Sequence, residues 1–156
     1  LGDVYKRQQQ YFTRDLPVGG HDFVKEIVDK KEIGYMEAQD LLYKDGISSI
    51  IKSDSLDDSS SLNVAERSVF DNLIEDIRRS LRFYAKQTGQ SFFLKILLTG
   101  GSADSPGLSE MISSKLNIDC NMLNPFYGVE GADSLTVDNP GQYVLAMGLC
   151  IRAGME

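Results

Sequence analysis

Two kinds of apolar pattern alternate along this chain, and together they predict a fold of mixed helices and strands. In residues 64–86 apolar side chains recur every three or four positions, as one face of a helix requires; they are Phe70, Leu73, Ile74, Ile77, Leu81 and Tyr84. Asn63, with Glu66 three residues later, is typical of a helix N-terminus, and Gly89 of a C-terminus. We therefore predict a long helix over Val64–Lys86 that packs against a sheet.

The stretch SFFLKILLTGGSADSPGLSEM, residues 91–111, predicts a strand that runs almost at once into a helix. Its apolar run, broken only by Lys95, is typical of a strand covered on both faces, so Ile96–Leu98 is expected to be a central strand of a parallel sheet. Ser105 and Pro106 suit the N-cap and the first position of a helix. The apolar residues that follow lie at helical spacing: Leu108, Met111, Ile112 and Leu116.

Shorter elements are predicted in the rest of the chain. The strands are expected at Gln10–Pro17 and Ile118–Leu123, and the helices at His21–Lys31, Met36–Tyr43 and Pro140–Ala153. Asp45-Gly46 should end the second of these helices. Ser53–Ser61, a short acidic run rich in serine, and Gly128–Asn139 are expected to be loops.

Two double glycines, Gly19-Gly20 and Gly100-Gly101, each stand between a predicted strand and a predicted helix. Ligands of α/β proteins usually bind at the carboxyl ends of parallel strands, and glycine permits positive φ and a close approach to the backbone. A lone Gly-Gly is equally typical of a tight turn with no ligand. Two such turns in one chain favour a ligand held between the two segments.

Composition narrows the classes of function. The chain has 156 residues, enough for one domain or a part of a larger protein, and a net charge of -7, which argues against a nucleic-acid surface. A cluster of cations at helical spacing is expected to be the solvated side of the long helix: Arg78, Arg79, Arg82 and Lys86. No apolar run of about eighteen residues exists, so no membrane span is predicted.

The remaining polar chemistry is sparse. Cys120 and Cys150 lack metal-ligand spacing and are interpreted as buried thiols of a cytosolic protein. His21 cannot build a metal cluster or a catalytic triad alone and is expected to be a surface or capping residue. Residues 1–8, LGDVYKRQ, have no signal-peptide pattern and are interpreted as a non-native leader at the edge of a truncated gene product.

Five short motifs follow one another in an order that resembles a known superfamily. They are RDLPVGG at 14–20, RRSLRFY at 78–84, LLTGGSA at 97–103 with PGL at 106–108, NPF at 124–126 and AMGL at 146–149. After residue 9 the chain resembles the actin-like ATPases, and RSLRFY and NPF make it most similar to the PilM proteins of type IV pilus assembly, relatives of the cell-division protein FtsA.

This resemblance implies an α/β fold made of two RNase H-like halves, of which the chain covers only the second, truncated at its N-terminus. Residues 9–156 would be that C-terminal half, a mixed sheet with flanking helices and a small helical subdomain around 21–62. The phosphate-binding hairpins of the superfamily would lie upstream. The sheet would then have an open edge, so we do not expect a stable monomer.

The resemblance also implies a nucleotide site. Gly100 and Gly101 would line the base and the α-phosphate of ATP, Ser102 and Ala103 would lie beneath the adenine, and Gly20 would approach the ribose. Glycine N–H groups near a helix start suit an anion. Magnesium would be held by residues outside this chain.

One helix departs from the family's Ala-Glu-x-x-Lys pattern. The matching residues here are Ala38, Gln39 and Leu42. Gln39 can still bond a ribose hydroxyl, but Leu42 cannot supply a positive charge, and losing such a contact costs about 1.5–3 kcal/mol. Lys44 would compensate if the alignment is shifted by two residues.

The function implied is a nucleotide-binding assembly adaptor, at most a weak ATPase, in the inner-membrane platform of the type IV pilus. Its expected partner is the cytoplasmic tail of a PilN-like membrane protein, so it would lie in the cytoplasm at the inner membrane, with self-association as a further expectation. The alternatives are a small-molecule kinase or exopolyphosphatase of the same superfamily, or an FtsA-type filament. FtsA ends in a basic amphipathic helix, which the final residues Gly154-Met155-Glu156 do not resemble.

Overall fold

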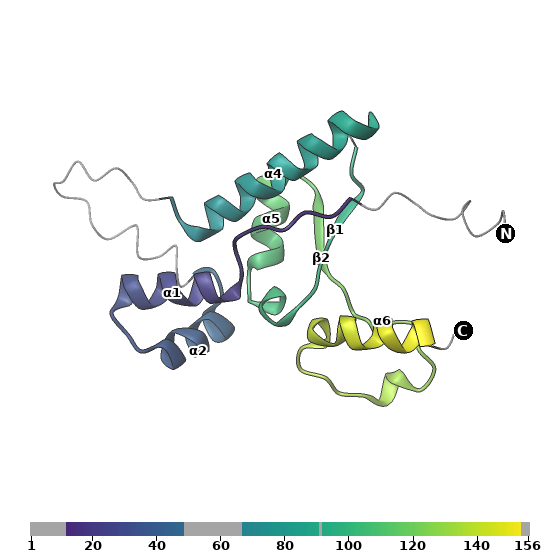
Figure 1. Cartoon of the computed structure of the whole chain (residues 1–156). Coiled ribbons are helices and arrows are strands. Elements are labelled where there is room, and N and C mark those ends of the chain that lie inside the picture. The colour runs from purple at the N-terminus through teal and green to yellow at the C-terminus, as the bar shows by residue number, and fades with distance from the viewer. Residues whose placement is uncertain (1–11, 49–66, 91, 154–156) are drawn as a thin grey trace.

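The computed structural model describes residues 12–48, 67–90 and 92–153, and these form an α/β fold (Figure 1). Two helices come first, α1 (Gly20–Lys31) and α2 (Tyr35–Asp45), and the long helix α4 (Val69–Thr88) follows. A β–α–β unit comes next: β1 (Lys95–Leu98), α5 (Leu108–Leu116) and β2 (Asp119–Met122). The last helix is α6 (Val144–Ala153). The predicted fold class is therefore confirmed.

The sheet consists of two parallel strands, β1 and β2. Ile96 lies opposite Cys120 and Leu98 opposite Met122, and α5 crosses over between the strands and packs on β2. The N–H of Leu123 donates to the Leu98 carbonyl (2.9 Å), which extends the ladder at its carboxyl end. Both predicted strands of this unit are confirmed, but among the described residues β1 pairs with β2 alone and is not the central strand that was predicted. Because the strands are parallel, their carboxyl ends lie at the same edge of the sheet, and the Gly100-Gly101 turn follows β1 close to where Leu123 follows β2.

One core joins the helices to the sheet. Phe70 and Ile74 of α4 and Ile112 of α5 are buried in it, and Ile96 and Leu98 of β1 pack against it. The other buried apolar residues are Phe23, Val24 and Ile27 of α1, Ala38, Leu42 and Ile47 in and after α2, Leu108, and Cys120. The apolar faces predicted for the long helix α4 and for α5 therefore point into the core, as expected.

Two predicted helix starts are wrong. Helix α4 begins at Val69, where the Ser68 hydroxyl accepts a hydrogen bond from Asp71 N–H (3.1 Å); the predicted cap Asn63 lies outside the described residues. Helix α5 begins at Leu108, not after Ser105. Because Gly107 has a φ of 80°, the chain makes one more turn, in which Leu108 N–H donates to the Ser105 carbonyl (3.1 Å).

The strand predicted at Gln10–Pro17 is also wrong over its described part, since residues 12–17 pair with no other strand. This segment lies against α4 instead. The ring of Phe12 packs on Phe83 and Tyr84, with centroids 5.5 and 5.9 Å away. Phe12 thus packs on a helix surface, so the apolar residues of this segment did not identify a strand.

The prediction that β1 is covered on both faces is not met in the described residues. Leu97 is 50% exposed and Leu94, just before the strand, is 81% exposed, whereas Ile96 and Leu98 lie against the core. Helix α6 has no buried residue, and Cys150, predicted to be buried, is exposed on it. Apolar surface at β1 and along α6 therefore faces outward.

Candidate functional site

The turn after β1 has a backbone that requires glycine. Gly100 has φ 106° and ψ 170°, a region essentially restricted to glycine, and residues Gly101–Asp104 then form a short 3₁₀ helix, η2. Gly101 has no positive φ, and a methyl group added to it would meet nothing within 4 Å. Of the two glycines, Gly100 is required by the backbone conformation of the turn, whereas Gly101 leaves open space next to the backbone.

The two double-glycine segments touch each other. A methyl group added to Gly20, the first residue of α1, would collide with the Ser102 hydroxyl and would lie 2.8 Å from the Ser102 Cβ. Gly20 therefore lies directly against η2. The structure brings together Gly20 and Ser102, two residues predicted to surround one ligand from distant parts of the sequence.

A second contact joins the end of α2 to the connection between β1 and α5. Gly46 ends α2 with φ 65° and ψ -154°, and a methyl group there would collide with the carbonyl of Pro106. The next residue, Ile47, donates its N–H to that carbonyl (3.2 Å). The connection between β1 and α5 is thus held on one side by the ends of α1 and α2.

A later segment, which the sequence analysis did not assign to the site, also holds the turn. Asn139 Nδ2 donates to the Gly101 carbonyl (2.7 Å), and Gly100 N–H donates to the carbonyl of Gly141 (3.0 Å). These residues lie at the start of the short helix η4 (Pro140–Tyr143), which leads into α6. Nothing local in the sequence links Asn139 to a turn 38 residues earlier.

The turn retains hydrogen-bond donors. Ala103 N–H donates to the Gly100 carbonyl (3.2 Å) and Ser105 N–H to that of Ser102 (3.2 Å). The N–H groups of Gly101 and Ser102 make no hydrogen bond to another described residue. Adjacent free N–H groups in a turn can bind a phosphate or carboxylate oxygen, so the donor set at this turn fits an anionic ligand.

The predicted contacts from α2 fit less well. Gln39 is half-buried; its Nε2 lies 3.5 Å from the Tyr43 hydroxyl on the same helix, and no hydrogen bond among the described residues ties it to the turn. Leu42 is 1% exposed and belongs to the core, while Lys44 is exposed. The position that matches the family's lysine therefore points into the protein, which explains why an apolar side chain occupies it.

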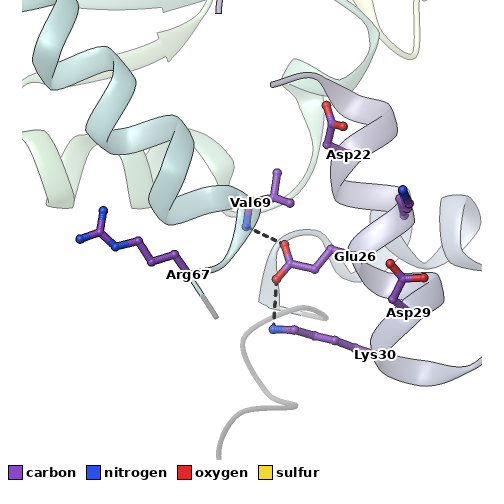
Figure 2. A pocket seen from close by; sticks show the side chains of 7 residues that line it. Asp22, Glu26, Asp29, Lys30, Arg67 and Val69 are labelled. Carbon is purple, nitrogen blue, oxygen red and sulfur yellow. Dashed lines mark hydrogen bonds and ion pairs between the residues drawn. The ribbon is translucent and has the colours of Figure 1, made fainter. Parts of the chain in front are cut away.

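Polar contacts away from the turn are structural. Between α1 and α4 lies a hollow of about 350 Å³ (Figure 2). There the carboxylate of Glu26, a side chain only 10% exposed, accepts from Val69 N–H (2.9 Å) and pairs with Lys30 (3.1 Å). Glu26 therefore joins α1 to the first turn of α4, where a carboxylate also complements the helix dipole.

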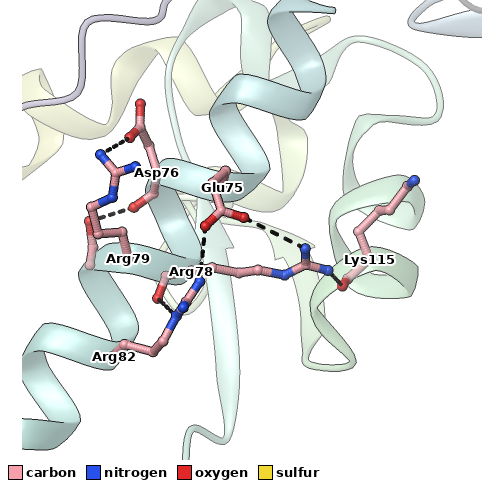
Figure 3. A network of polar contacts seen from close by, with 7 residues as sticks. Glu75, Asp76, Arg78, Arg79, Arg82 and Lys115 are labelled. Carbon is pink, nitrogen blue, oxygen red and sulfur yellow. Dashed lines mark hydrogen bonds and ion pairs between the residues drawn. The ribbon is translucent and has the colours of Figure 1, made fainter. Parts of the chain in front are cut away.

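The basic side of α4 is solvated, as predicted. Arg82 pairs with Glu75 (3.0 Å) and Arg79 with Asp76 (3.5 Å), and Arg78 donates to the Lys115 carbonyl of α5 (2.5 Å), as Figure 3 shows. The carboxylates of α4 thus neutralise part of this surface. Exposed pairs of this kind contribute little to stability.

Other chemistry is limited within the described residues. They contain no group of three or more His, Cys, Asp and Glu side chains that could hold a metal ion. His21 Nδ1 lies 3.1 Å from the Tyr35 hydroxyl at the surface. Burial, and secondarily the charge of Glu110, raises the pKa of the Cys120 thiol above its ordinary value, so this thiol is a poor nucleophile. Of the described helices, none combines the length and the apolarity needed to cross a bilayer.

Comparisons with known proteins agree with this fold. A family model described as "Type IV pilus assembly protein PilM" matches residues 2–154. Among solved structures, a chain of the "PilM-PilN type IV pilus biogenesis complex" is similar, with a TM-score of 0.62 and 20% sequence identity. The match covers 92% of this chain and 39% of that one, so this chain spans well under half of that relative. No curated protein matches the sequence.

Proposed function

Because this chain belongs to the family of the type IV pilus assembly protein PilM, we propose that it forms the C-terminal part of an actin-like adaptor that binds ATP and organises pilus assembly at the inner membrane. The observation that carries the proposal is the direct contact of Gly20 with Ser102. It places two glycine-rich segments together at the carboxyl end of β1, where α/β folds bind ligands.

In this proposal the ATP lies on the turn after β1. Gly100 and Gly101 give it access to the backbone, and the free N–H groups of Gly101 and Ser102 face an oxygen of the nucleotide. Ala103 lies beneath the base, and Gly20 and Gln39 lie near the ribose. Magnesium is held by the other half of the protein. Since Leu42 is buried and supplies no cation, the affinity is expected to be modest.

The partner proposed is the cytoplasmic tail of a PilN-like membrane protein. The solved relative is a complex of PilM with PilN, and no described helix of this chain can span a membrane. A cytoplasmic protein held at the inner membrane through this tail fits both observations. No particular observation favours the kinase, exopolyphosphatase or FtsA-type alternatives.

Nucleotide binding is tested with Gly101→Val in the full-length protein. The valine should block the approach to the turn and weaken binding of a fluorescent ATP analogue at least tenfold, because a branched side chain fills the space beside the turn. The fold should survive, since a methyl group at Gly101 meets nothing within 4 Å. Gly34→Val is the matched control, because Gly34 has equal space and caps α2. Unchanged affinity in a folded Gly101→Val protein would return this turn to a purely structural role.

The partner is tested separately, by calorimetric titration of the full-length protein with a synthetic peptide of the PilN-like tail from the same organism. Binding in the micromolar range or tighter is expected, and a scrambled peptide of the same composition is the control. Equal binding of the two peptides, or none, would remove the adaptor role without bearing on the ATP site.

A further inference from the structure

We infer that Asn139 is a positioning residue for the ATP site, one that aims the Ser102 N–H at the nucleotide by anchoring the Gly101 carbonyl. The inference rests on the proposed function and deepens it, because it names a residue outside the glycine turn that controls the shape of the turn. Asn139 precedes η4 and reaches the turn from 38 residues away.

The anchor acts through the geometry of one peptide unit. The carbonyl of Gly101 and the N–H of Ser102 belong to the same planar trans peptide and point in opposite directions. Asn139 Nδ2 holds the carbonyl at 2.7 Å. The Ser102 N–H must therefore point away from Asn139, and it makes no hydrogen bond to another described residue. Rotation of this peptide would turn the donor away from a bound oxygen.

A second hydrogen bond from the same segment fixes the preceding peptide. Gly100 N–H donates to the Gly141 carbonyl (3.0 Å), and Gly141 is buried against Met122, whose Cε would lie 2.9 Å from an added methyl group. Gly141 is therefore packed closely against the Met122 side chain. The segment Asn139–Gly141 thus holds the turn by hydrogen bonds at two successive residues, Gly100 and Gly101.

Asparagine at position 139 destabilises the protein through its buried carbonyl oxygen, and only the hydrogen bond donated by its Nδ2 compensates for this. Asn139 Oδ1 is buried and has no hydrogen-bond partner among the described residues. Leaving a buried acceptor unpaired is unfavourable, and an apolar side chain of similar size would avoid it. Such a side chain could not donate to Gly101, so the amide Nδ2 is the functional atom.

The test replaces the donor without changing its shape. In Asn139→Asp at about pH 7.5 the carboxylate cannot donate and repels the Gly101 carbonyl, so affinity for a fluorescent ATP analogue should fall about tenfold relative to wild type. When the pH is lowered to about 4, where an aspartic acid takes up a proton, the carboxyl can donate again. The deficit relative to wild type should then shrink, which a pH-independent loss of packing at this position would not do.

Two variants make the result specific. Asn139→Ala removes the donor without adding charge, so its deficit should stay constant with pH, and it serves alone if the aspartate variant does not fold at neutral pH. Asn121→Asp makes the same chemical change at an exposed position of β2 and should bind normally. Hydrogen exchange at the Gly100 and Ala103 amides, measured without nucleotide, should be faster in both Asn139 variants.

The outcomes separate the inference from the function on which it rests. If wild type does not bind the analogue, the proposed function fails and the inference fails with it. Normal affinity of Asn139→Ala and Asn139→Asp at neutral pH overturns the inference alone, even if amide exchange is faster. Weaker binding in both, with recovery at low pH only in the aspartate variant, supports it.

Discussion

At the scale of single residues, Gly46 shows how strongly a backbone can restrict the side chain. Its φ of 65° and ψ of -154° lie in a region open essentially to glycine, and the Pro106 carbonyl occupies the space where a methyl group would go. We predict that Gly46→Ala lowers the free energy of unfolding by about 1–3 kcal/mol or more, measured by urea denaturation. Gly34→Ala, at φ -68° with open space around it, should change it little. Equal effects of the two substitutions would contradict this account.

At Leu42, burial restricts which side chain the protein can accept. Leu42 is 1% exposed, so Leu42→Lys should bury an ammonium group and cost several kcal/mol instead of adding a nucleotide contact. We expect a large drop in melting temperature and no gain in ATP affinity by calorimetry. Met36→Lys, on the same helix but 71% exposed, is the control and should melt near wild type. Tighter ATP binding by Leu42→Lys at an unchanged melting temperature would restore the family's lysine contact.

At the scale of elements, the start of α4 depends on two hydrogen bonds, from Asp71 N–H to the Ser68 hydroxyl and from Val69 N–H to Glu26. Ser68→Ala removes the first and should cost about 1 kcal/mol of unfolding free energy. Ser114→Ala, an exposed serine inside α5, is the matched control and should be close to neutral. No loss in Ser68→Ala would mean that Glu26 alone suffices to cap the helix.

Elements were predictable from the sequence where their causes are local. The three- and four-residue spacing around Phe70 and Ile74 fixed which face of α4 is buried, because that spacing is a property of the helix itself. Ser105-Pro106 satisfied the rule for a helix start, but the positive φ of Gly107 delayed α5 to Leu108. That turn depends on packing against the end of α2, which no local rule contains.

The candidate site was predictable only in part, because some of its contacts are local and others join distant parts of the chain. Its glycines stand out in the sequence because a strand and a helix flank them. The partners that hold the turn come from far away: Gly20 meets Ser102, and Asn139 meets Gly101. Such contacts depend on how α1, β1 and η4 pack together, so the residue pattern gave no sign of Asn139.

At the scale of the whole molecule, one part of the exposed apolar surface lies beside β1. Phe92 and Leu94 are 71% and 81% exposed, and among the described residues β1 pairs with β2 alone, so its other edge has no strand beside it. Bare edges and apolar patches favour association. We predict that this chain self-associates with rising concentration, as measured by light scattering after size-exclusion chromatography.

A charge placed at this edge should oppose that association. Leu94→Lys should shift the chain toward monomer without lowering its unfolding free energy, because Leu94 is already exposed. Tyr127→Lys, at a side chain 91% exposed in the loop after β2, should leave association unchanged. If both variants associate as wild type does, the edge of β1 is not the contact.

The contact of Gly20 with Ser102 has a consequence for how related sequences can change over time. The space between them holds one small side chain, and Ser102 fills it. In a lineage where alanine replaces Gly20, Ser102 must first be replaced by glycine. In a lineage that keeps Ser102, position 20 must remain glycine. The two positions should therefore vary together across species. Independent variation of the two, in a large alignment of such chains, would show that the backbone relaxes to admit both side chains.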